Sequence, residues 1–226
     1  MQPVDSPQPL PVLVYDAILN GICEGTLQSG QRLTQEELAE RLNVSRLPVG
    51  QALQWLKAEG FVCSAGKRGV KVTPLSPELV RDLYEFRSGV DMFAAGAAAE
   101  RATARQRERG REIVAEGRSA LAAGDIPMLI GADIDFHQLI YEMAGNEVIT
   151  DVMGARWKHI RRIMSAIIDD TENQIRIWQE HEAILDAVAA GDRARAERLA
   201  RAHVDDASHW LQQQLAEDTA VNKRTG

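Results

Sequence analysis

Residues 34–62 read TQEELAERLNVSRLPVGQALQWLKAEGFV, and this stretch decides the fold of the N-terminal part of the chain. Thr34, followed three residues later by Glu37, forms a capping box that predicts the start of a short helix. Ser45 is a suitable N-cap for a second helix over 45–58. The apolar face of that second helix comprises Val49, Ala52, Leu53 and Leu56. Two short helices in this order predict a helix-turn-helix.

The flanking residues complete a winged helix-turn-helix. A further helix is expected over 11–24, and two short strands are expected over 61–63 and 70–72. The loop between the strands is basic and forms the tip of a β-hairpin. Three helices followed by such a hairpin are typical of a winged DNA-binding domain.

Beyond a Pro-containing linker at 73–77, the sequence predicts helices alone. We expect six, over 77–102, 104–123, 126–144, 146–168, 172–190 and 192–216. The expected fold is therefore mostly α, with an N-terminal winged helix-turn-helix (three helices plus a β-hairpin wing) followed by an all-α helical bundle. The expected domain organisation is a disordered N-terminus at 1–9, a winged helix-turn-helix DNA-binding domain at 10–74, an all-helical domain at 75–216 and a polar tail at 217–226.

The charge of the chain is unevenly distributed. The net charge is -7, yet residues 1–74 carry seven basic and seven acidic side chains, so the whole excess lies after them. Six basic residues stand against Glu59 alone within 41–74, which suits contact with phosphates. The chain has no apolar run long enough to span a bilayer, and its first ten residues lack the pattern of a signal peptide. We therefore expect a cytoplasmic protein with no membrane partner.

The polar face of the helix over 45–58 is the expected DNA-reading surface. Arg46 opens this helix, where a guanidinium can bond a guanine edge twice. Gln54 and Lys57 continue the same face, and Lys67 and Arg68 at the hairpin tip suit minor-groove or phosphate contacts. Since one winged helix covers a half-site, the expected partner is double-stranded DNA with a pseudo-palindromic operator, bound by a homodimer.

The sequence resembles the GntR family of regulators over nearly all of 11–74. The matching residues are GTLQSGQRL at 25–33, ELAERLNVSR at 37–46, Pro48-Val49, Ala52-Leu53, EGFV at 59–62 and Arg68-Gly69. The residues after Pro74 resemble the FCD effector-binding domain of the FadR subfamily, in its six-helix VanR-like branch. With the reading face above, the resemblance gives these expected DNA-binding residues: Thr34, Ser45, Arg46, Leu47, Gly50, Gln54, Lys57, Lys67, Arg68 and Gly69.

The reading helix departs from the family pattern at two positions. The family usually carries Ser-Arg-Thr-Pro-Val-Arg-Glu-Ala-Leu, whereas residues 45–53 read SRLPVGQAL. Gly50 thus replaces an arginine that usually contacts DNA, and Leu47 replaces a hydroxyl that could bond phosphate. We therefore expect DNA binding, but not the operator preference that is usual in the family.

Four polar groups fall on apolar helix faces in the C-terminal part. Asp133 and His137 lie four residues apart on one helix, and His181 and His203 lie on the last two. A single inward histidine is more often a hydrogen-bonded core residue, but four such groups on three helices favour a shared divalent transition metal. Zinc is the first choice, and nickel, manganese and iron are alternatives. The resemblance implies the same ligands, since metal-binding members of the family carry Asp-x-x-x-His on one helix and single histidines on the last two.

Arg87 shares the inward face of its helix with Leu83, Val90 and Ala94. In one interpretation it only pairs with Asp91, four residues later. In the other it is an effector-binding residue that clamps a carboxylate with two hydrogen bonds. The resemblance favours the second, because many members of the family sense organic acids beside the metal.

These features predict a DNA-binding transcription regulator, not an enzyme, whose operator affinity is controlled by a small carboxylate effector at a metal-containing pocket. One alternative is a regulator that senses the metal ion itself. Another is a metal-dependent hydrolase, in which Asp133 and the histidines activate water. The hydrolase account lacks a well-placed second carboxylate as general base, and it gives a fused DNA-binding module no role.

Overall fold

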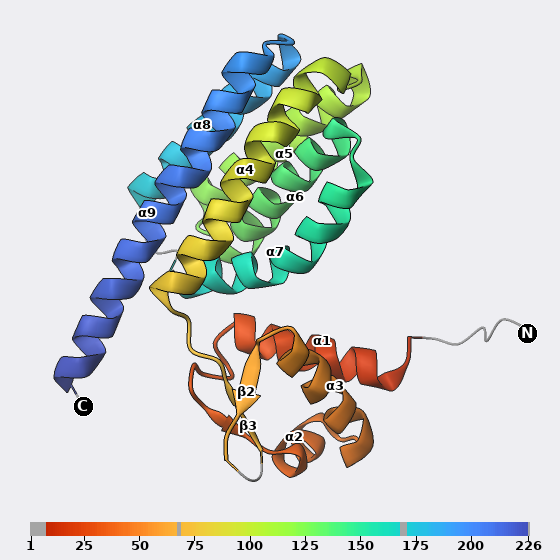
Figure 1. The fold of residues 1–226 in the computed structure, drawn as a ribbon, viewed down its shortest axis with the longest axis vertical. Helices are drawn as coiled ribbons and strands as arrows, with labels where there is room; N and C mark the ends of the chain where they lie inside the picture. Colours follow the sequence, from red (N-terminus) through yellow and green to blue (C-terminus); the bar gives the residue numbers. More distant parts are fainter. Residues whose placement is uncertain (1–7, 67–68, 168–170, 226) are drawn as a thin grey trace, which may run out of the picture. The chain divides into compact units, whose positions relative to one another are not determined.

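The computed structural model describes residues 8–66, 69–167 and 171–225, and the chain divides into two compact units, Met1–Leu75 and Ser76–Gly226 (Figure 1). The first unit carries a small sheet among helices, and the second is built of helices over its described residues. Each unit has its own buried core, so each is described by itself.

The first unit is the winged helix-turn-helix that the sequence predicts. Its elements in chain order are α1 (Leu10–Cys23), β1 (Arg32–Leu33), α2 (Gln35–Leu42), α3 (Arg46–Ala58), β2 (Val62–Ser64) and β3 (Val70–Val72). The strands form an antiparallel sheet in the order β1-β3-β2. The two-residue strand β1 is an addition to the prediction: Arg32 pairs with Lys71 and Leu33 with Val70.

The local start and end of α2 follow the predicted chemistry. The Thr34 hydroxyl accepts the Glu37 N–H at 3.2 Å, and the Glu37 carboxylate accepts the Thr34 N–H at 3.1 Å. Asn43 ends the helix in the left-handed conformation, with φ of 52°, which asparagine tolerates better than most residues. Ser45 occupies the N-cap of α3, but its side chain makes no capping hydrogen bond.

The core of the first unit fixes the orientation of α3. Val49, Ala52 and Leu56 on α3 are fully buried and pack with α1 and the base of the hairpin, where Phe61 and Val72 are also fully buried. This face is the apolar one that the sequence predicts. The opposite face of α3, which carries Arg46, Gln54 and Lys57, is consequently exposed to solvent.

The second unit contains the helices α4 (Pro77–Arg101), α5 (Ala104–Ala123), α6 (Ile126–Ala144), α7 (Glu147–Ile167), α8 (Thr171–Ala189) and α9 (Arg193–Thr225). Gly124, Gly145 and Gly191 lie in the predicted breaks with positive φ values of 66°, 62° and 71°. The last helix differs from expectation: α9 continues beyond residue 216, where a polar tail was expected, as far as Thr225. The polar composition of that stretch does not prevent helix formation.

In the second unit α4 packs against α9 and α6, and α8 packs against α9 and α5. Figure 1 shows α4 running beside α9, with α5 and α6 behind α4. Helices α4 and α9 approach closely because residues 94–99 of α4 are alanine and glycine: a Cβ at Gly96 would lie 2.4 Å from the Glu197 carboxylate. Arg193 at the start of α9 also bonds Glu100 at 2.9 Å. No helix within the described residues is both long and apolar enough to cross a membrane.

Candidate functional site

One exposed hollow of about 690 Å3 lies in the first unit, between α2, α3 and the hairpin. Six of the residues predicted to contact DNA line it: Thr34, Arg46, Gly50, Gln54, Lys57 and Gly69. Ser45 and Leu47 lie at the exposed start of α3, where Leu47 has 73% of its surface accessible. Lys67 and Arg68, the predicted contacts at the hairpin tip, lie outside the described residues.

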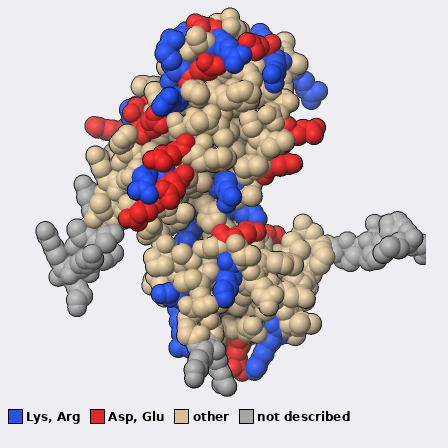
Figure 2. Space-filling model, viewed as in Figure 1, with Lys and Arg blue, Asp and Glu red and all other residues tan. Residues whose placement is uncertain are grey.

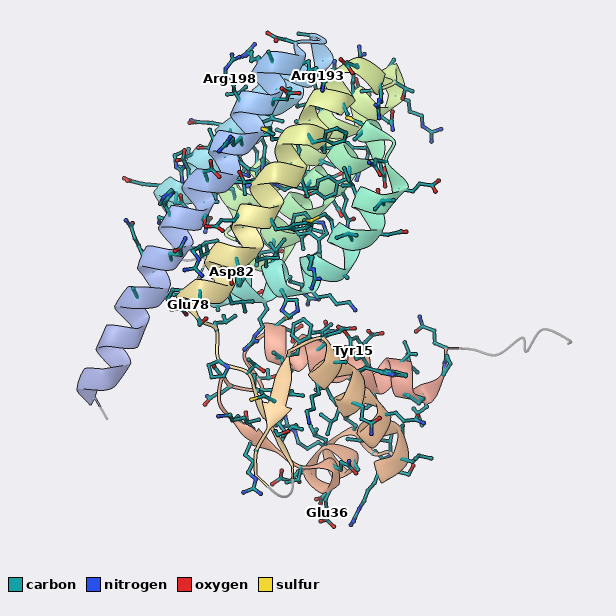
Figure 3. All side chains as sticks on the ribbon, viewed as in Figure 1. Tyr15, Glu36, Glu78, Asp82, Arg193 and Arg198 are labelled. Atoms are coloured by element: carbon teal, nitrogen blue, oxygen red, sulfur yellow. The ribbon has the colours of Figure 1, made fainter. Side chains whose placement is uncertain are left out.

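The hollow also contains residues that the sequence did not single out. Gln35 and Glu36, from the first turn of α2, line it together with Arg32 of β1. Glu36 projects outward from α2 (Figure 3) and forms an ion pair with Arg46, in which both side chains are largely exposed. This ion pair forms because α2 packs against α3. The helical periodicity of either segment alone could therefore not predict it.

Charge on the second unit forms no single-sign face in the view of Figure 2, where blue and red side chains are interspersed over its helices. Several of the charged side chains of this unit form ion pairs with their neighbours. Examples are Arg109 with Glu112 and Glu116, and Arg118 with Glu182.

The interior of the second unit brings the four predicted metal ligands together. Asp133 and His137 lie on α6, His181 on α8 and His203 on α9, and at most 5% of the surface of any of them is accessible. One ring nitrogen of each histidine lies within 4.8 Å of a ring nitrogen of each of the other two. His181 Nε2 lies 3.3 Å from His203 Nε2 and 3.5 Å from Asp133 Oδ1.

Three of these residues carry buried atoms that the rest of the described chain leaves without a hydrogen bond: Asp133 Oδ2, His137 Nε2 and His181 Nδ1. An unsatisfied buried polar atom costs free energy. Three imidazoles and one carboxylate are ligands that zinc and related divalent ions accept. The residues present therefore fit a metal ion of this class.

Second contacts hold two of the histidine rings in place. His137 Nδ1 lies 3.1 Å from Asp91 Oδ2, and His203 Nδ1 lies 2.8 Å from Glu180 Oε2. A carboxylate on the far nitrogen of a metal-binding histidine fixes the tautomer that leaves the other nitrogen as ligand. Sequence reasoning assigned no role to Glu180, and it offered Asp91 as a partner of Arg87 alone.

His181 is held by aromatic rings instead. Its ring stacks on Phe136 at 4.3 Å between centroids and meets Trp178 edge-on at 4.9 Å. Trp178 in turn lies against Gly117 of α5, where a Cβ would come within 2.0 Å of the indole. The absence of a side chain at residue 117 thus determines where Trp178, and with it His181, can lie.

The electrostatics favour neutral imidazoles at His137 and His181 beside a charged carboxylate at Asp91. Burial lowers the pKa of His137, and the nearby charge of Arg87 lowers it further. Burial also lowers the pKa of His181 well below its usual value, and His203 and His137 add to this effect. Burial alone would raise the pKa of Asp91, but Arg87, His137 and Tyr141 outweigh it and lower that pKa to about 2. Neutral imidazole is the form that binds a metal ion.

Arg87 makes the contact with Asp91 that the first interpretation predicts, while its role as an effector clamp stays a prediction. Its Nε donates to Asp91 Oδ2 at 3.2 Å, and its guanidinium lies over the rings of Trp157 and Tyr84. Its Nη2 is buried and makes no hydrogen bond within the described residues. Arg87, Asp133 and His203 line one cavity of about 40 Å3.

Comparison with known proteins agrees with this division of the chain. Residues 12–72 match the family described as bacterial regulatory proteins, gntR family, and residues 82–206 match the FCD domain. The HTH-type transcriptional regulator LutR of Bacillus subtilis is 31% identical over 219 residues, which cover 84% of this chain and 95% of LutR. The HTH-type transcriptional repressor RspR of Escherichia coli is 24% identical, over 91% of this chain and 90% of RspR.

Solved structures share the fold. The E. coli protein McbR/YncC superposes with a TM-score of 0.78 at 19% identity, covering 92% of this chain and 99% of that one. A putative GntR regulator from Rhodococcus sp. RHA1 gives a TM-score of 0.75 at 25% identity, covering 89% and 96%. With both family matches and a relative aligned over most of its length, the chain belongs to the GntR family of DNA-binding transcription regulators and carries an FCD domain as its C-terminal unit.

Proposed function

We propose that this regulator binds a pseudo-palindromic operator as a homodimer and that a small carboxylate, bound beside a divalent metal in the FCD domain, controls its affinity for DNA. The observation that carries the proposal is that three atoms facing the interior site, Arg87 Nη2, Asp133 Oδ2 and His137 Nε2, are buried without a hydrogen bond from the described residues. A metal ion and an anion together would satisfy all three.

Asp133, His137, His181 and His203 would hold the metal, with zinc as the first choice and nickel, manganese or iron as alternatives. The metal would supply a Lewis acid for a ligand oxygen. The three histidines are buried. Carboxylates hold the second nitrogens of His137 and His203, and Phe136 stacks on the ring of His181, so neighbouring side chains fix the orientation of all three rings. Such preorganisation favours binding.

The chemistry of the cavity favours a short acid as effector. Arg87 presents a free guanidinium N–H for a carboxylate, while Ile177, Trp210 and Leu211 supply apolar walls. A cavity of about 40 Å3 has room for a few water-sized groups, since one water needs roughly 10–15 Å3 of accessible space. We therefore expect an acid of few heavy atoms.

A ligand in this cavity would contact several helices at once. Arg87 lies on α4, Asp133 on α6, Gln174 on α8 and His203 on α9. The ligand can change operator affinity only if it binds one conformation of the domain more tightly than another. Such coupling typically changes affinity by about 5–150-fold. In a homodimer, such a conformational change would reach both DNA-binding domains. The homodimer itself is tested by light scattering, and a monomer at micromolar concentration would contradict it.

The test compares wild type with the double variant His181→Ala/His203→Ala, and uses His209→Ala as control because His209 is an exposed histidine of the same helix α9. Elemental analysis should find metal in wild type and the control and little in the double variant. Operator titrations with added carboxylic acids should show a change in DNA affinity in wild type and in His209→Ala, but not in the double variant. Operator binding itself should survive in part, since the predicted DNA contacts all precede Pro74.

Equal metal content in all three proteins would refute the metal site. Loss of metal with an intact response to acids would leave the metal a structural role only. A response to metal in the absence of any acid would favour a sensor of the ion itself over a sensor of carboxylates.

A further inference from the structure

Gly50 lies on the exposed side of α3, one helical turn after Arg46 and one turn before Gln54. A Cβ at this position would lie 3.3 Å from Nε2 of Gln35, 3.5 Å from its Cδ and 3.6 Å from its Oε1. The whole side-chain amide of Gln35 therefore lies over the Gly50 backbone. A side chain at residue 50 would have to share this space with the amide, which comes from α2.

The basic side chains of the described residues that line this hollow are Arg32, Arg46 and Lys57. Arg46, one turn earlier on α3, pairs with Glu36, the residue that follows Gln35. Gln54 and Lys57 line the hollow further along α3. The middle of the predicted reading face thus presents an amide and bare backbone.

A glutamine amide suits one DNA base in particular. Its NH2 group donates and its carbonyl accepts side by side, which matches the N7 acceptor and the N6 amino donor of adenine in the major groove. A guanine edge presents two acceptors and pairs better with arginine or lysine. The chemistry at the centre of the hollow therefore favours adenine.

We propose that Gln35 is a specificity-determining residue that reads an adenine in each operator half-site, and that Gly50 provides the room for it. The proposal rests on DNA binding by α3. Gln35 reaches the reading face from α2 because residue 50 has no side chain, so the operator preference of this chain is set by both helices. Glycine inside a helix lowers the stability of that helix. At residue 50, the missing side chain leaves room for the amide of Gln35, which gives Gly50 a function.

The test is selection of double-stranded DNA from a randomised library at fixed salt, followed by sequencing, with the full-length protein. Wild type, Gln35→Ala and Gln51→Ala are compared. Gln51 is the matched control because it is an exposed glutamine of α3 outside the hollow. Wild type and Gln51→Ala should enrich the same motif, with an adenine at one position of each half-site. Gln35→Ala should lose about tenfold or more of the preference for that adenine, the scale of one good bidentate base contact, and keep the preferences elsewhere.

An unchanged motif in Gln35→Ala would overturn the role of Gln35 while leaving DNA binding intact. A wild-type protein that enriches no motif would overturn sequence-specific binding, and this inference with it. Loss of the same adenine preference in Gln51→Ala would also contradict the assignment, because the effect would then not depend on contact with the hollow.

Discussion

His137 Nδ1 and Arg87 Nε meet at the same carboxylate oxygen of Asp91, at 3.1 Å and 3.2 Å. The other oxygen of Asp91 accepts the Tyr141 hydroxyl. Asp91 therefore links the residue proposed to clamp the effector with a residue proposed to bind the metal. A ligand that draws Arg87 toward itself would act on a carboxylate that also orients His137.

Asp91→Asn should weaken both functions of the interior site. The amide removes the negative charge that holds the buried Arg87 and orients His137, so we expect about 10–100-fold weaker metal binding. We also expect a loss of about 3–5 kcal/mol in the free energy of unfolding, because Arg87 is left buried without its partner. Competition with a chelator and urea unfolding measure the two effects.

Asp82→Asn is the control for this prediction, since Asp82 lies on the same helix and its side chain is 66% exposed. It should leave metal affinity unchanged and alter stability little. Metal affinity of Asp91→Asn equal to that of the control would show that Asp91 does not position His137.

Glu180→Gln should weaken metal binding with a smaller effect on folding. Glu180 accepts from His203 Nδ1 at 2.8 Å and from Arg176 at 2.6 Å, and it is only half-buried. The loss of its charge should lower metal affinity by about tenfold. Glu182→Gln, at an exposed glutamate two residues later on α8, is the comparison. Identical affinities in the two variants would count against a positioning role for Glu180.

Gly117→Ala should disturb the site from a distance. The added Cβ would lie 2.0 Å from the Trp178 ring, and Trp178 supports His181. Overpacking of this kind typically costs about 1–3 kcal/mol, and displacement of His181 should lower metal content as well. Thermal unfolding and elemental analysis record both.

Gly154→Ala serves as the reference for that change, because Gly154 lies in α7 and a Cβ added there would meet nothing within 4 Å among the described residues. It should be neutral or stabilise by up to about 1 kcal/mol through helix propensity. If Gly117→Ala behaved like Gly154→Ala, the packing of Trp178 would not determine the position of His181.

Glu36→Gln should strengthen DNA binding, whereas Arg46→Ala should weaken it. Glu36 neutralises Arg46 in the free chain and carries a negative charge toward phosphates. Its removal frees the guanidinium, while loss of Arg46 should cost about 1–3 kcal/mol if it reads a guanine. Fluorescence anisotropy with a selected operator measures both. Wild-type affinity in Arg46→Ala would show that α3 docks differently.

Sequence periodicity predicted the elements whose contacts are local. The capping box of Thr34 and Glu37 and the apolar face of α3 are contained within a few residues, and both are confirmed. Strand β1 escaped prediction because Arg32 and Leu33 become a strand only by pairing with residues of the distant β3. The helical pattern alone also did not indicate how far α9 extends.

The interior site could be anticipated from polar residues on apolar faces, but its supporting contacts could not. Asp133, His137, His181 and His203 stand out as single residues in the sequence, and their role as ligands stays a prediction. Glu180 adjoins His181 in the chain yet bonds His203 on another helix. Gln35 likewise gains its place over Gly50 only when α2 packs on α3. Such pairs depend on tertiary packing, which no helical period encodes.

The most direct measurement of the central claim is the operator affinity of the metal-loaded and the metal-stripped protein, each titrated with a panel of short carboxylic acids at fixed salt. The account predicts that at least one acid shifts the affinity of the metal-loaded protein by about 5–150-fold and leaves that of the metal-stripped protein unchanged. An equal shift in both forms, or no shift with any acid in the metal-loaded form, would contradict it.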